Sequence, residues 1–139
     1  MLVADASVLV AELMRDRWWT IARDARLELL VTDAQWSETD YEVSRRLAYL
    51  LVQRRIAATQ HDLIRQNIVH MHEQRLIEVI PSDWYDDPEE VARRRIPRDP
   101  NDWPPVVAAI ALNADMLTND HDFRGAVVRP GHSRRCARN

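Results

Sequence analysis

The stretch "RDPNDWPPVVAAIALNADMLTNDHDF", residues 98–123, places an apolar helix and an apolar strand between acidic residues. Pro104 and Pro105 fit only the first turn of a helix, because proline has no backbone N–H to donate farther along. We therefore expect the helix to begin between residues 102 and 105 and to end near Asn113. A strand is predicted at 115–118. The aspartates on either side of these two elements are Asp99, Asp102, Asp115, Asp120 and Asp122.

The rest of the chain alternates between short apolar runs and longer amphipathic stretches. The apolar runs predict strands at 2–5, 27–31 and 77–81, and a fifth strand at 126–128 is left open. The amphipathic stretches predict helices at 8–13, 17–27, 34–56, 60–76 and 87–95. Ser7 is the expected N-cap of the first helix, and Thr59 with Asp62 resembles a capping box. This alternation predicts the α/β class, with a parallel sheet of four to five strands covered on both faces.

Length and composition exclude several classes of protein. The 139 residues, 46% of them hydrophobic, suit a single domain, which we place at 1–130 with a polar tail at 131–139. No apolar run is long enough to span a membrane, and "MLVADASVLV" lacks the basic start of a signal peptide, so we expect a cytoplasmic protein without membrane contact. The single cysteine excludes an internal disulfide. With only two glycines, the chain has neither common glycine-rich phosphate loop.

Four acidic residues come from four different segments that are predicted to end at one edge of the sheet. Asp5 ends the first strand, and Glu38 lies in the first turns of the helix after the second. Asp102 opens the helix near residue 103, and Asp120 follows the strand at 115–118. Functional groups of open parallel sheets gather outside the carboxyl ends of the strands. Carboxylate ligands alone suit Mg²⁺ or Mn²⁺, so the pattern predicts a divalent-metal site there.

Three stretches resemble the PIN domain, the nuclease fold of VapC-type toxins in toxin-antitoxin pairs. They are "VADASVLV" at the start, "VTDAQWSETDYEV" in the middle and "DWPPVVAAIALNADMLTNDHDF" near the end. The resemblance implies a three-layer α/β/α fold and a Mg²⁺- or Mn²⁺-dependent endoribonuclease. It also implies an RNA substrate, a cognate antitoxin and a homodimer. The residues that match the acidic quartet of the family are Asp5, Glu38, Asp102 and Asp120.

Other interpretations of these acids stay open. Glu42 could replace Glu38, although Arg45 and Arg46 make Glu42 the better candidate for a salt bridge. Asp99 and Asp122 could also approach the site. Asp102 could be only an N-cap and Asp120 only a turn residue, whereas Asp5 is the sole charge in nine residues of a buried segment. The alternative function is a PIN-like module that binds RNA or a protein partner without cleaving it.

The chain offers its own reason for self-association. The two long helices carry more apolar positions than one sheet face needs, and a twofold partner could cover the surplus. Arginine pairs at 45–46 and 54–55 and a triplet at 93–95 could line a track for RNA phosphates, or could be solvated helix faces. The apolar positions expected at the dimer interface are Leu50, Leu51, Ile64, Ile68 and Met71.

Overall fold

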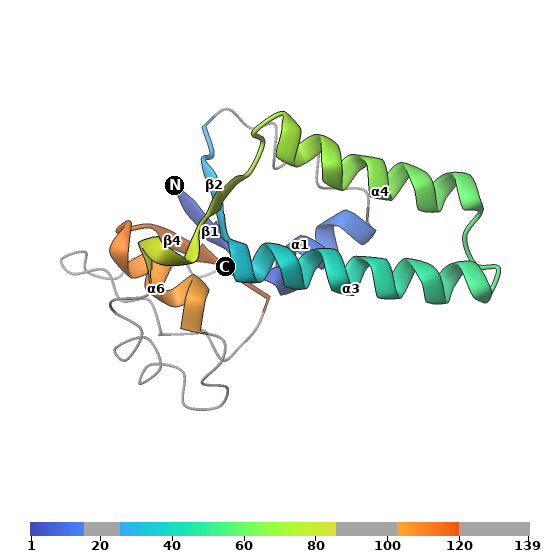
Figure 1. Cartoon of the computed structure of the whole chain (residues 1–139), viewed down its shortest axis with the longest axis horizontal. Helices are drawn as coiled ribbons and strands as arrows, with labels where there is room; N and C mark the ends of the chain where they lie inside the picture. Colours follow the sequence, from blue (N-terminus) through green and yellow to red (C-terminus); the bar gives the residue numbers. More distant parts are fainter. Residues whose placement is uncertain (16–25, 86–102, 120–139) are drawn as a thin grey trace, which may run out of the picture.

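The computed structural model describes residues 1–15, 26–85 and 103–119. Its centre is a four-stranded parallel sheet in the order β3-β2-β1-β4 (Figure 1). Each strand lies within one to two residues of the bounds that the sequence predicts, and the open fifth strand at 126–128 falls outside the described residues. The strands are β1 (Leu2–Ala4), β2 (Leu29–Thr32), β3 (Glu78–Ile80) and β4 (Asp115–Leu117).

Helices connect and cover these strands. The described ones are α1 (Ala6–Met14), α3 (Asp33–Val52), α4 (Ala58–Glu73), the single 3₁₀ turn η1 (Ser82–Trp84) and α6 (Trp103–Ala111). α6 begins where its two prolines predicted. α3 ends four residues before the expected position, and Arg54, at φ 53°, has the left-handed backbone that terminates a helix. None of these helices is long and apolar enough to cross a membrane.

Both predicted N-caps are wrong. The N-cap of α1 is Asp5, two residues before Ser7, and the N-cap of α4 is Ala57, so that Thr59 already lies in the first turn. In each case the helix begins earlier than the polar signal, because tertiary packing fixes the start of the helix. The helix predicted at 87–95 and most of the one at 17–27 lie outside the described residues.

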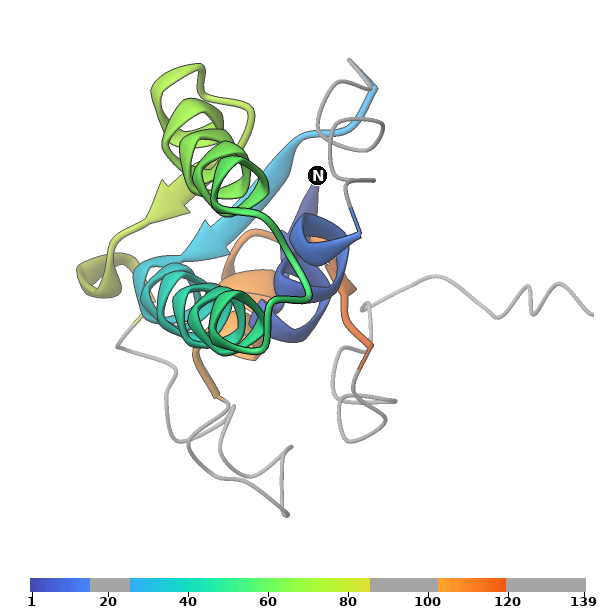
Figure 2. The ribbon, with the colours of Figure 1, turned by 90° about the vertical axis from the view of Figure 1, so that its right-hand side faces the viewer.

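The sheet separates two apolar layers, as the predicted three-layer α/β/α fold requires. Alternate strand residues point to opposite faces. Val3 and Leu30 face α6, whereas Ala4 and Val31 face α1, α3 and α4. Figure 2, seen from the right-hand side of Figure 1, shows α1 beside both long helices. In the described part of the chain, one helix covers one face and three cover the other, which confirms the predicted architecture.

The long helices α3 and α4 run side by side away from the sheet (Figure 1). An ion pair of 2.6 Å between Arg65 and Asp40 joins them. The expected apolar surplus is wrong for three of its five members, because Ile64, Ile68 and Met71 are buried in the core beneath α4. They pack against α1, α3 and the sheet within a single chain. Only Leu50 and Leu51, near the end of α3, stay partly or largely exposed.

Candidate functional site

Asp5 lies directly after the carboxyl end of β1 and immediately before α1. An aspartate at this boundary commonly accepts a hydrogen bond from the first turn of the helix, yet the Asp5 side chain caps none of the N–H groups of α1. The residue is only 6% exposed. The residue is thus buried, and its carboxylate makes no capping hydrogen bond to the backbone of the helix that it precedes.

Two hydroxyl groups hold the Asp5 carboxylate. Ser7 Oγ donates to Oδ2 at 2.5 Å, and Thr118 Oγ1 donates to the same oxygen at 3.0 Å. Ser7 Oγ also accepts a hydrogen bond from the Asn119 N–H at 3.4 Å. The network joins the segment after β1 to the segment after β4, as parallel topology predicts for carboxyl ends of adjacent strands.

Glu38 lies on the second turn of α3 and is exposed to solvent. Its Oε2 accepts a hydrogen bond of 3.3 Å from Gln35 Nε2. The Gln35 side chain is buried, and its Oε1 accepts from the backbone N–H of Ala6 at 2.7 Å. One carboxamide therefore joins Glu38 to the residue next to Asp5. These two acids, which are 33 positions apart in the chain, lie at the same edge of the sheet.

Glu42 forms the predicted salt bridges. Its Oε2 lies 2.8 Å from Arg45 and 3.6 Å from Arg46 on the surface of α3. The hydrogen bond from Arg45 lowers the pKa of Glu42 below its usual value, and the charges of both arginines act in the same direction. A carboxylate already neutralised by two guanidinium groups is a poor ligand for a cation. Of the two glutamates, Glu38 is therefore the better candidate for the site.

The remaining predicted acids lie outside the described residues. These are Asp102 and Asp120, together with the alternatives Asp99 and Asp122. Within residues 1–15, 26–85 and 103–119, no three acidic, histidine or cysteine side chains gather closely enough to hold a metal ion. The described part thus supplies two of the four predicted ligands.

A second polar cluster, which the sequence did not predict, ties the segment after β3 to the start of α3. Asp33 accepts hydrogen bonds from the Tyr85 hydroxyl and, at 3.0 Å, from the Ser82 N–H. Burial raises the pKa of Tyr85 well above its usual value, and the hydrogen bond to the Asp33 carboxylate raises it further. The Tyr85 ring contacts Trp103 edge to face, with centroids 5.7 Å apart. This contact joins the cluster to the first residue of α6.

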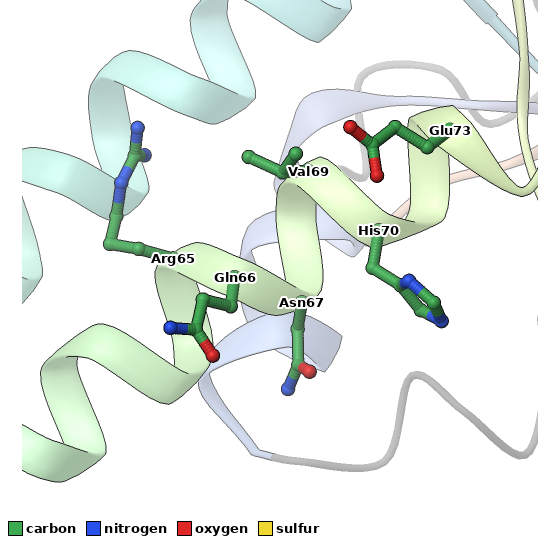
Figure 3. Close-up of a pocket in the computed structure, with 6 residues that line it drawn as sticks. All are labelled: Arg65, Gln66, Asn67, Val69, His70 and Glu73. Carbon is green, nitrogen blue, oxygen red and sulfur yellow. The ribbon is translucent and has the colours of Figure 1, made fainter.

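A hollow of about 510 Å³ lies elsewhere on the molecule, along α4 (Figure 3). The last turn of α4 leads to the amino end of β3, whereas Asp5 follows the carboxyl end of β1. The hollow is therefore separate from the acidic edge. The side chains that line it are Arg65, Gln66, Asn67, Val69, His70 and Glu73.

The parallel sheet with a buried aspartate at the end of its first strand defines an α/β domain whose polar residues converge on one edge. The profile of the PIN domain family matches residues 3–137, so the chain belongs to the PIN domain family. PIN domains are generally nucleases and typically use divalent metals. A comparison with curated proteins found no similar sequence.

Proposed function

We propose that the protein is a Mg²⁺- or Mn²⁺-dependent endoribonuclease and the toxin of a toxin-antitoxin pair. The observation that carries this proposal is the buried Asp5 carboxylate, which two hydroxyls orient. Gln35 joins Glu38 to the backbone N–H of Ala6, the residue after Asp5. Burial of a carboxylate costs free energy unless a partner offsets it. Membership of the PIN domain family supplies the reaction class, phosphodiester hydrolysis.

The donor set of the described residues fits a hard cation. Asp5 and Glu38 offer only carboxylate oxygens, the ligands that Mg²⁺ and Mn²⁺ prefer. Asp102 and Asp120 complete the proposed set. When bound, the cation would activate water for attack and stabilise the charge that develops on the scissile phosphate.

The residues of this chain have separate tasks in that reaction. Asp5 would bind the cation through a carboxylate that is already oriented, because Ser7 and Thr118 both donate to its Oδ2. Glu38 is exposed to solvent and would bind the cation directly or orient it through a water molecule. Burial of Asp5 keeps the ligand group away from competing water, which strengthens its attraction for a cation.

A cleavage assay on the full chain tests the proposal. We expect single-stranded RNA to be hydrolysed in Mg²⁺ or Mn²⁺, and the products to disappear with chelator and with Asp5→Asn. Arg65→Gln is the matched control, because Arg65 contacts Asp40 and Ser44 across the α3–α4 pair, and neither is a proposed ligand. Binding of RNA without any metal-dependent cleavage would instead support a non-catalytic binding module.

The toxin role and the partners require a separate experiment. Expression of the wild type should arrest growth of a bacterial host, and Asp5→Asn should not. Co-expression of the small protein encoded next to it should relieve the arrest and copurify as the antitoxin. The apolar surface that could form the interface of the proposed homodimer is smaller than the sequence predicted. It consists of the exposed side chains of Tyr49, Leu51 and Val52 at the end of α3.

A further inference from the structure

We infer that Gln35 is a positioning residue that sets the Glu38 carboxylate relative to Asp5. The inference rests on the proposed metal-dependent nuclease function, which it deepens. Gln35 is the third residue of α3 and is 4% exposed. A buried carboxamide needs partners for both of its polar atoms, and here the two partners belong to the two halves of the candidate site.

The chemistry of the partners fixes which way the amide of Gln35 points. The backbone N–H of Ala6 can only donate, so it must face Oε1, and the distance is 2.7 Å. Nε2 then faces Glu38, whose Oε2 can accept, at 3.3 Å. A flipped amide would place an N–H against an N–H and an oxygen against a carboxylate. The orientation of the amide is therefore determined by the contacts themselves.

The backbone of Gln35 is held on both sides by buried threonines. Its N–H donates to Thr32 Oγ1 at 3.3 Å, and its carbonyl accepts from Thr39 Oγ1 at 2.7 Å. On the other side of the site, the N–H of Asp5 donates to the carbonyl of Leu117 at 3.0 Å, which attaches Asp5 to β4. Gln35 thus spans two fixed pieces of backbone.

Glu38 benefits most from this arrangement. It is exposed, and the rotamers that a glutamate can adopt on a helix surface are restricted when it binds a ligand, which costs conformational entropy. A donor on a buried, fixed side chain restricts those rotamers before the ligand arrives. Loss of a side chain that hydrogen-bonds to a metal ligand commonly lowers metal affinity by about 10- to 100-fold.

Mn²⁺ binding by the full chain tests the inference. Gln35→Met keeps the length of the side chain and removes both polar contacts. We expect its Mn²⁺ affinity, measured by calorimetry and by Mn²⁺ electron paramagnetic resonance, to fall by about tenfold or more. Raising the Mn²⁺ concentration should restore most of the cleavage rate with little change in KM for RNA. Gln66→Met is the matched control, since it makes the same substitution on α4, at the hollow that is separate from the acidic edge.

A double-mutant cycle shows whether Gln35 acts through Glu38. In a Glu38→Gln background, Gln35→Met should cost no further Mn²⁺ affinity, because the contact that it removes no longer serves a carboxylate ligand. Gln35→Asn provides a second variant that keeps the position polar and withdraws the amide by one methylene, about 1.5 Å. It should weaken Mn²⁺ binding as Gln35→Met does.

The outcomes separate this inference from the proposed function. If the wild type binds Mn²⁺ and cleaves RNA, while both Gln35 variants match Gln66→Met in Mn²⁺ affinity, Gln35 has only a structural role and the inference is wrong. Equal losses in the presence and absence of the Glu38 carboxylate would also overturn it. A wild type that neither binds Mn²⁺ nor cleaves RNA would overturn the proposed function together with the inference.

Discussion

Asp5→Asn should abolish cleavage and leave the metal-free protein as stable as the wild type or more stable. The side chain is 6% exposed and accepts two hydroxyl hydrogen bonds on one oxygen. Asparagine keeps a carbonyl oxygen that can accept both. A hydrogen bond to a neutral acceptor is weaker than one to a charged acceptor by about 1 kcal/mol. The two bonds together therefore lose roughly 2 kcal/mol of stabilising free energy in the variant.

The substitution also removes a buried charge. Ser7 and Thr118 contribute no positive charge, and the cost of keeping a carboxylate out of water without a cation is several kcal/mol, of the order of 3 kcal/mol after relaxation. The two effects nearly cancel, with a small balance in favour of asparagine. For a domain of this size, roughly 1 kcal/mol changes Tm by about 3–5 °C. We therefore expect an unchanged Tm or a rise of a few degrees.

Circular dichroism melts should be recorded with chelator, because a bound cation stabilises only the wild type by mass action and would hide the effect. Asp5→Ala is the matched control. It lacks the charge, as Asp5→Asn does, but it also removes the acceptor of both hydroxyls, so it should be less stable than Asp5→Asn by about 1–3 kcal/mol. A fall in Tm for Asp5→Asn as large as that for Asp5→Ala would refute the reasoning and show that Asp5 serves the fold as a charged acceptor.

Three further predictions concern the neighbouring elements. Glu38→Gln should reduce the rate of single-turnover RNA cleavage by at least about 100-fold. Glu42→Gln, which loses only its arginine partners, should cleave RNA at nearly the wild-type rate. The opposite result would identify Glu42 as the metal ligand. Tyr85→Phe should lower the free energy of unfolding in urea by about 1–2 kcal/mol. The pKa of Tyr85 is raised in the folded state, so its contribution to the free energy of unfolding is complete below the unfolded pKa of 10.0 and is lost as pH rises above that value. Only the wild type should therefore show this loss of stability at alkaline pH. Sedimentation at tens of micromolar should detect a homodimer that Val52→Glu dissociates, and a monomeric wild type would contradict that proposal.

The fold was predictable because its signals are distributed over whole elements. Each strand is a run of apolar residues, and the two prolines of α6 confine the start of that helix to residues 102–105. Errors arose where a single polar residue was used to place a boundary. Ser7 and Thr59 both have side chains suited to an N-cap. The start of each helix is nevertheless set by the packing of several apolar residues together and not by one polar residue.

The candidate site was predictable only in part, and for a different reason. Asp5 could be found because a lone charge in a buried strand conflicts with its surroundings. Gln35 could not be found, because glutamine in the first turn of a helix is ordinary, and its partner Ala6 is 29 positions away. The same holds for Thr118, which reaches Asp5 across 113 positions. No periodic pattern encodes such pairs.

This division has a physical origin in how the site is built. Apolar burial is not directional, so any sequence with the right pattern forms the sheet and places its strand ends at a common edge. Orientation of a carboxylate requires hydrogen bonds with defined geometry, and these come from side chains on other elements. Ser7 lies beside Asp5 in the chain, whereas Gln35 and Thr118 reach the edge only when β2 and β4 have paired with β1. Correct strand pairing is therefore a precondition for the orientation of Asp5. A substitution that weakens either pairing should disturb the site before it unfolds the core.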